Sequence, residues 1–299
     1  MFATLLGPLP RPPLPSAASA LDLVRAAVAA QAEAGLDPLT DGGQWGDDTS
    51  VLERWSATAG LTDRAVKAVV DGPYTTVLRQ RGAADGAGLE RELATAAAAT
   101  NDVLRALAAA GCPLVEVHEP AATRIGDDGE ARRRFVETQR RLLDGVSGIH
   151  ASLAIVGGNA DRTGVETLLA APFASLALDL IDGPDNWRLA ASAPPSTGVV
   201  AGALSARPVA DESLEVLVWA LGYAASTGGR GPDRIGLATA GSLAELSWDV
   251  AVRRMTLLGE AVRLATGTPD ERAAVLDPRA ISIRGAALGR AGIRRARRS

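Results

Sequence analysis

The sequence predicts a single (β/α)₈ barrel of the TIM type. Short apolar runs alternate with longer segments of helical spacing, and there are eight of each before about residue 265. The runs are almost continuously apolar, as in parallel strands that helices cover. A doubly wound open sheet is the alternative, but it requires a glycine-rich fingerprint after the first strand. Here Gly7 is followed by Pro-Leu-Pro-Arg-Pro, which favours the barrel.

The expected strands are short and end at glycine, proline or polar residues, which commonly terminate strands. The second of them runs directly into a polar loop. In chain order the eight strands are Phe2–Gly7, Asp37–Gly43, Ala65–Pro73, Pro113–Pro120, His150–Gly158, Ala174–Leu180, Thr197–Ser205 and Arg234–Gly241.

The expected helices have apolar residues at three- and four-residue spacing. The first ends on a glycine, which is a common helix stop. In chain order they are Leu21–Gly35, Val51–Ala59, Gly88–Ala110, Glu130–Asp144, Thr163–Ala171, Asp185–Ala191, Asp211–Ser226 and Leu243–Leu264.

Composition narrows the class of protein. The 299 residues are 47% hydrophobic, which allows a sizeable core and excludes a mainly disordered chain. No apolar run reaches the roughly 18–20 residues of a membrane span, and the proline-rich start is unlike a signal peptide. Cys112 is the single cysteine, so no internal disulfide can form. We therefore expect a cytoplasmic protein without a membrane partner.

Basic residues are distributed unevenly. Lys67 is the only lysine, and this arginine-rich, alanine-rich usage indicates GC-rich coding. From Arg284 onward there are six arginines and no acid, although the whole chain has a net charge of −4. The preceding body is therefore acidic, which argues against nucleic-acid binding. We expect a barrel over residues 1–265 and a C-terminal extension over 266–299 with a basic, disordered tail.

Polar residues follow the expected strands at the ends where barrel enzymes place their chemistry. The fourth strand is the most informative, because Glu116 and His118 share one face of a buried strand and need partners or a ligand. With Glu119 they are the candidate catalytic residues, as an acid–base cluster. The candidate substrate-binding residues are Arg11, Asp41, Asn159, Asp179 and Arg207. Further polar strand ends are Asp71, Asp182, Ser205, Thr239 and Ser242.

These segments resemble the cobalamin-independent methionine synthase family, whose barrels share a superfamily with uroporphyrinogen decarboxylase. The start TLLGPLPRP is similar to the family's PRP-containing opening, GLDPLTDGGQ to its "GLDIxTDGE" motif and VDGPYT to "LxGPxT". AAAGCPLVEVHEPA is similar to "LxxAGxxxIQIDEPA", and GGN, LALDL and VVAGALSAR follow in the family's order. The resemblance covers roughly residues 2–265 and implies methyl transfer to or from a small amino-acid-like or folate-like ligand.

The chain departs from the family at its zinc site. The resemblance implies a zinc ion held by "HxC" on the fifth strand, a glutamate on the sixth and a cysteine near the eighth. The fifth strand here offers His150-Ala151-Ser152 or Ala154-Ile155-Val156, the sixth has Asp179, and the eighth ends in Thr239-Ala240-Gly241. Without thiolate ligands, zinc is not expected, and we predict no metal site. His118 and Gly43 also replace the family's aspartate and glutamate.

Three functions therefore remain open. The first is a divergent methyltransferase acting on a small molecule, with a folate-type methyl donor as the possible cofactor. The second is a non-catalytic barrel that binds a ligand or supports a partner enzyme. The third is a metal-free decarboxylase-type lyase, which would use Arg11, Arg79 and Arg207 to hold substrate carboxylates. The oligomeric state does not follow from the sequence.

Overall fold

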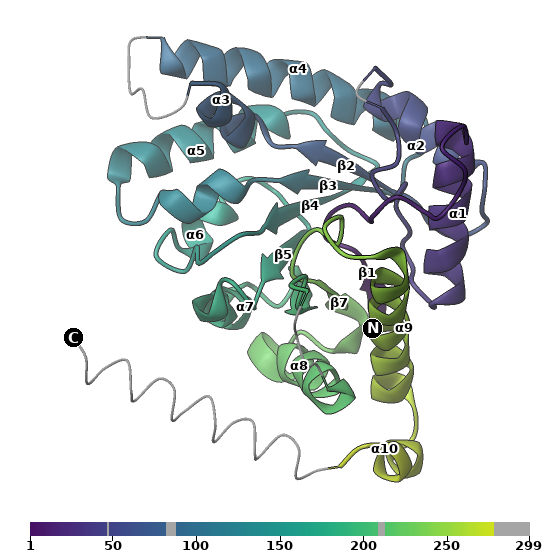
Figure 1. Ribbon diagram of the computed structural model, residues 1–299. Helices are drawn as coiled ribbons and strands as arrows, with labels where there is room; N and C mark the ends of the chain where they lie inside the picture. The colour runs from purple at the N-terminus through teal and green to yellow at the C-terminus, as the bar shows by residue number, and fades with distance from the viewer. Residues whose placement is uncertain (47, 82–87, 209–212, 278–299) are drawn as a thin grey trace.

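Seven parallel strands form one curved sheet with helices around it in the computed structural model (Figure 1). The structure describes residues 1–46, 48–81, 88–208 and 213–277. The strand order is β1-β7-β6-β5-β4-β3-β2, so each strand from β2 to β7 lies beside the next one in the chain. A doubly wound sheet would reverse direction at its first strand. The sequential order instead is that of a TIM-type barrel, as the sequence predicts.

The strands are short and largely buried. They are β1 (Phe2–Thr4), β2 (Lys67–Asp71), β3 (Leu114–His118), β4 (His150–Ile155), β5 (Ser175–Asp179), β6 (Gly198–Leu204) and β7 (Ile235–Thr239).

The helices lie on the outside of the sheet. They are α1 (Ala20–Glu33), α2 (Val51–Ala59), α3 (Pro73–Arg81), α4 (Leu89–Ala109), α5 (Gly129–Leu142), α6 (Val165–Leu168), α7 (Trp187–Ser192), α8 (Leu214–Ser226), α9 (Trp248–Thr266) and α10 (Pro269–Val275). Short 3₁₀ turns follow β3 and β5, at η1 (Pro120–Arg124) and η2 (Pro184–Asn186), and two more lie between α8 and β7, at η3 (Thr227–Gly229) and η4 (Pro232–Arg234).

The expected second strand is reduced to a single bridge. Leu39 pairs with Val66 in parallel, and the amide of Asp37 donates to the carbonyl of Ala3 at 2.8 Å. The segment thus lies between β1 and β2, in the position of the missing strand. It cannot extend, because Pro38 has no N–H and the chain turns at Gly42 and Gly43, where φ is 68° and 69°.

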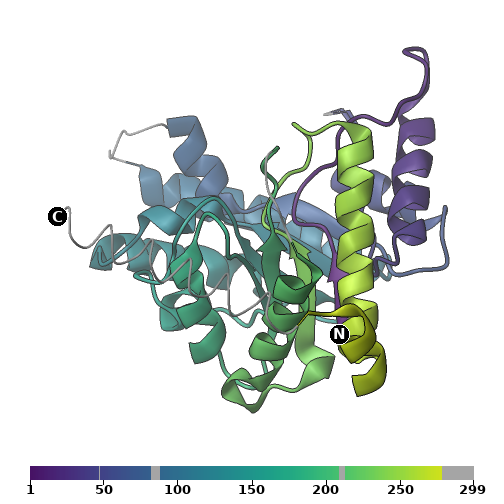
Figure 2. The ribbon, with the colours of Figure 1, turned by 60° about the horizontal axis from the view of Figure 1, so that its bottom comes forward.

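The first and last strands also pair with each other. Phe2 is opposite Gly236 in the register of β1 and β7. In Figures 1 and 2 α1 and α9 run side by side, and α9 packs against β1. Residues from both ends of the barrel sequence therefore meet, and closure depends on contacts more than 200 residues apart in the chain.

The sheet separates two apolar regions. On the helix side, large residues such as Phe135, Leu153 and Leu176 are fully buried. On the inner side, the buried cluster consists of mostly small side chains, Leu6, Ala154, Ala177, Val200 and Ala238. The inner side of the sheet therefore carries mainly small apolar groups at this level.

Two helices were not expected from the sequence. α3 begins directly at Pro73, after the predicted strand end, and α10 follows the last barrel helix. The predicted tail from Arg284 onward lies outside the described residues, so the boundary near residue 265 and the tail's disorder stay predictions.

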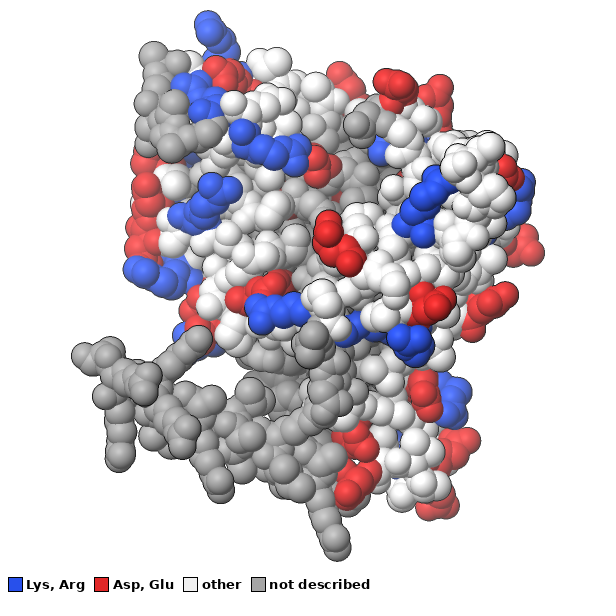
Figure 3. Space-filling model, viewed as in Figure 1, with Lys and Arg blue, Asp and Glu red and all other residues white. Residues whose placement is uncertain are grey.

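No helix in the described ranges is long and apolar enough to cross a membrane. Acidic and basic side chains are interspersed on the face shown in Figure 3.

Candidate functional site

Three charged or polar side chains form a continuous chain inside the barrel. The ammonium of Lys67 lies 2.7 Å from Oε2 of Glu116, and Nε2 of His118 lies 2.8 Å from Oε1 of the same carboxylate. Lys67 also donates to the carbonyl of Leu5 at 2.6 Å. Lys67 and Glu116 are buried, whereas the His118 side chain is 13% exposed at the carboxyl end of β3. This series of three contacting side chains therefore leads from the barrel interior to the barrel mouth.

The electrostatics of this chain fix the protonation of the carboxylate. Burial by itself would raise the pKa of Glu116, but the Lys67 ammonium and the hydrogen bond from His118 lower it to about 2. Glu116 is therefore ionised at neutral pH and can only accept hydrogen bonds. It follows that Nε2 of His118 carries a proton, and that in the neutral ring Nδ1 is an acceptor. Among the described residues, Nδ1 has no hydrogen-bond partner.

Strand register brings these three residues together. Lys67 is opposite Leu114 and Asp71 is opposite His118 in the pairing of β2 with β3. Since alternate residues share a face, Glu116 lies on the same inner face as His118. Sequence reasoning identified the Glu116/His118 pair but missed Lys67. A signal existed, because a lone lysine within the apolar segment AVKAVV must find a buried partner.

Glu119 has a different set of contacts. Its carboxylate accepts the backbone amides of Tyr74 and Thr75 at 3.1 and 2.7 Å and the side-chain amide of Gln139 at 2.6 Å. The two backbone donors belong to the first turn of α3, so Glu119 satisfies free amides at this helix start. Burial raises the pKa of Glu119, although these hydrogen bonds oppose the shift. The structure thus places Glu119 on the helix side, in contact with α3 and α5.

A glycine makes this arrangement possible. A Cβ added to Gly72 would lie 2.1 Å from the carboxyl carbon of Glu119. No larger residue fits there while the carboxylate keeps its three donors. The glycine directly after β2 is therefore explained by Glu119, which approaches the backbone from the segment that follows β3.

Asp179 and Asp41 are held by backbone amides. Asp179, at the end of β5, accepts the amides of Gly157, Ile181 and Asp182 at 2.9–3.0 Å. Burial raises its pKa against those hydrogen bonds. Asp41 accepts the amide of Gly43 at 2.8 Å, and burial raises its pKa too. Both carboxylates thus fix the conformation of loops at the barrel mouth.

The remaining predicted residues are exposed and bond to nearby loops. Arg11 donates to the carbonyl of Pro15 at 3.2 Å, and Arg207 forms an ion pair with Asp182. Asn159 accepts the amide of Asp185 at 2.8 Å and lines an open cleft of about 500 Å³ among loops that follow β3, β4 and β5. The structure therefore joins Glu116 to His118 directly. Arg11, Arg207 and Asn159 each bond to a different partner and do not join that pair.

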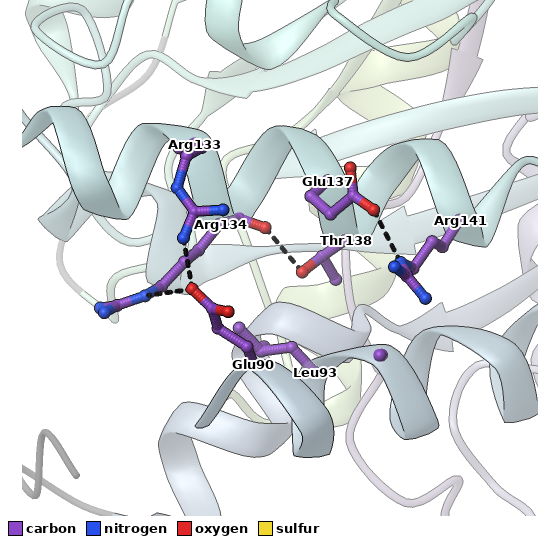
Figure 4. Close-up of a pocket in the computed structure, with 8 residues that line it drawn as sticks. Glu90, Leu93, Arg133, Arg134, Glu137, Thr138 and Arg141 are labelled. Carbon is purple, nitrogen blue, oxygen red and sulfur yellow. Dashed lines mark hydrogen bonds and ion pairs between the residues drawn. The ribbon is translucent and has the colours of Figure 1, made fainter. Parts of the chain in front are cut away.

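A second cleft lies on the outside of the barrel, between α4 and α5 (Figure 4). Its volume is about 170 Å³, and its walls carry ion pairs such as Arg133 with Glu90 and Arg141 with Glu137. These charges already neutralise one another in solvent. It lies away from the strand ends, so we do not assign it to the candidate site.

The residues present do not fit the zinc site that the resemblance implies. His150 lies at the amino end of β4, opposite the mouth, while Ala154 and Val156 occupy the mouth end of that strand. The Cys112 thiol is buried before β3, where burial raises its pKa. Asp179 already receives three amides. In the described part of the chain, no group of three or more His, Cys, Asp and Glu side chains could hold a metal ion.

Comparison with known proteins supports the architecture. No family model matches the sequence, and no curated protein matches it. A solved B12-independent methionine synthase from Shewanella sp. W3-18-1, in complex with selenomethionine, is similar with a TM-score of 0.71 and 16% identity, over 87% of this chain and 96% of that chain. A methyltransferase from Methanosarcina mazei is similar with a TM-score of 0.54 and 16% identity, over 71% of this chain and 63% of that chain. At this identity the likeness shows a shared barrel fold.

Proposed function

We propose that this protein is a zinc-independent barrel of the methionine synthase type. It binds a small amino-acid-like ligand at the carboxyl ends of its strands, with His118 as the acid–base group. The observation that carries the proposal is the chain Lys67–Glu116–His118, which leaves Nδ1 of His118 as an acceptor at the mouth. The fold likeness to a methionine synthase that holds selenomethionine supports the ligand class.

The chemistry of the site follows from the ionised carboxylate. Glu116 holds the imidazole in one orientation and keeps the proton on Nε2, as a buried carboxylate does for a catalytic histidine. Nδ1 can then accept a hydrogen bond from the ammonium or thiol of a ligand. If it takes the proton, Glu116 stabilises the resulting imidazolium.

The finer proposal is methyl transfer from a folate-type donor to a thiol. Nδ1 of His118 removes the thiol proton, the sulfur forms a bond to the methyl carbon as the donor's carbon–nitrogen bond breaks, and the donor nitrogen takes up the proton. Among the described residues no cluster could hold a metal ion, and we assign to His118 the role of promoting thiol ionisation at the mouth. Candidate binding groups are Asp41, Asp179 and Asn159 in the surrounding loops, with Arg11 and Arg207 at their edge.

Calorimetric titration with L-methionine and L-homocysteine tests the proposal. We expect H118A to weaken binding at least tenfold, because the ligand loses its acceptor. H150A is the matched control, since His150 is the only other histidine and lies at the opposite end of the barrel. Equal binding by H118A and the parent protein would remove His118 from the site.

A second experiment separates an enzyme from a binding protein. The protein is incubated with homocysteine and 5-methyltetrahydrofolate, and methionine is measured. Product that disappears in H118A supports methyl transfer, whereas binding without product supports the non-catalytic alternative. The lyase alternative has less support, because Arg79 and Arg207 are already paired with Asp71 and Asp182, respectively.

A further inference from the structure

A cavity that is separate from the two clefts described above opens at the amino ends of the strands, opposite the mouth. Its volume is about 220 Å³, and it lies among the first residues of six of the seven strands. The walls are apolar at Phe2, Leu114 and Val200, and Lys67 and Ser152 supply polar groups.

One polar group in the cavity has no partner. The Ser152 side chain belongs to a residue that is 2% exposed, and its hydroxyl has no hydrogen-bond partner within the described ranges. A buried hydroxyl without a partner costs free energy, so its presence calls for a bound group. Lys67 lies on the same wall and uses two of its three donors, on Leu5 and Glu116. The Ser152 hydroxyl can therefore donate to an oxygen atom in the cavity.

The charges around the cavity favour an uncharged oxygen. Lys67 and Glu116 neutralise each other, and burial lowers the pKa of His150, so that ring is neutral at pH 7. A carboxylate placed next to Ser152 would lie close to the ionised Glu116 across the β3–β4 register. Such a like-charge contact in a buried site is unfavourable.

We propose that this cavity is a second binding site, for a small molecule with a hydrocarbon body and one uncharged oxygen. The oxygen bonds to Ser152, and the hydrocarbon contacts the apolar walls. Cavities of roughly 150 Å³ in other proteins hold a benzene ring, so one ring with its substituent fits the volume here. Exposed residues of the loops before β6 and β7, Ser196, Asp233 and Arg234, border the opening.

Three probes of similar shape test the proposal on the full-length protein by calorimetry. Phenol has the uncharged oxygen, toluene replaces it with a methyl group, and benzoate carries a charge. We expect phenol to bind with one molecule per chain, and toluene and benzoate to bind at least tenfold more weakly. No saturable binding of phenol would overturn the proposal. Tighter binding of benzoate would also overturn it, since the site would then select an anion.

Two serine substitutions locate the site. S152A removes the hydroxyl, and we expect at least a fivefold loss of phenol affinity together with an unchanged or higher urea midpoint, because an unsatisfied group is removed. S242A is the matched control, because Ser242 is exposed in the loop after β7 at the opposite end of the barrel. If S152A binds phenol like the parent protein, or lowers the urea midpoint, the hydroxyl is structural and the proposal is wrong.

Discussion

The ammonium of Lys67 contacts the carboxylate of Glu116 at 2.7 Å inside the barrel, and the two side chains are 0% and 2% exposed. A buried pair of this kind is costly to break, because the remaining charge loses its partner and has no water around it. The pair also places a fixed negative charge behind His118. It therefore links the stability of the barrel to the candidate site.

Replacing Lys67 should destabilise the fold strongly. We expect K67M to lower the free energy of unfolding by about 3–5 kcal/mol, since Glu116 stays buried without its cation. The double variant K67M/E116Q should recover part of that loss. R79A is the control, because its ion pair with Asp71 is exposed and contributes at most about 1 kcal/mol. Urea denaturation measures all four proteins, and similar effects of K67M and R79A would contradict the buried pair.

The same pair predicts acid sensitivity. The pKa of Glu116 is about 2 in the folded protein and near 4.5 when unperturbed. Because the pKa of Glu116 is lower in the folded protein, its ionised form stabilises the fold at every pH above the pKa of the unfolded chain. This stabilisation is lost as the pH falls from about 4.5 towards 2. The shift corresponds to about 3 kcal/mol.

Urea unfolding between pH 2.5 and 7 tests this with E116Q. The free energy of unfolding of the parent protein should exceed that of E116Q at pH 5, and the difference should shrink as the pH is lowered further. Glu119 and Asp179 have raised pKa values, so their effect on the free energy of unfolding changes with pH in the opposite direction. Both groups are present in the parent protein and in E116Q, so their effect cancels in the difference. A difference that stays constant down to pH 2.5 would contradict the lowered pKa.

Gly72 should be intolerant of even one methyl group. In G72A the new Cβ would lie 2.1 Å from the carboxyl carbon of Glu119, which cannot move without losing its hydrogen bonds to α3. We expect a loss of at least about 3 kcal/mol in the free energy of unfolding, from overpacking and unsatisfied amides. G126A is an informative partner, since a Cβ added to Gly126 would meet no atom within 4 Å and only its φ of 54° opposes the change. A smaller loss in G72A than in G126A would contradict this packing.

Metal removal should leave the protein unchanged. The donor atoms at the mouth do not form a zinc site, since Asp179 is occupied by amides and Cys112 is buried elsewhere. We expect elemental analysis to find no stoichiometric zinc, and EDTA to alter neither the urea midpoint nor methionine binding. One tightly held zinc ion per chain would contradict this and would revive the metal-dependent form of methyl transfer.

The sequence by itself determined the alternation of strands and helices and hence the barrel. This information is local, because continuous apolar runs and helical spacing report which residues each element buries. It also placed Glu116 and His118 on one strand face. The second strand was overestimated, since its apolar start at Leu39 is interrupted by Pro38 and the turn at Gly42.

Only the tertiary structure decided which groups are partners. Lys67 finds Glu116 across the β2–β3 register, and Glu119 reaches the start of α3 from the next strand. The free hydroxyl of Ser152 lies in a cavity that residues from six strands form together. These relationships join residues far apart in the chain, so spacing and composition do not encode them. The pairing of β2 with β3 brings Lys67 and Glu119 within hydrogen-bonding distance of their partners.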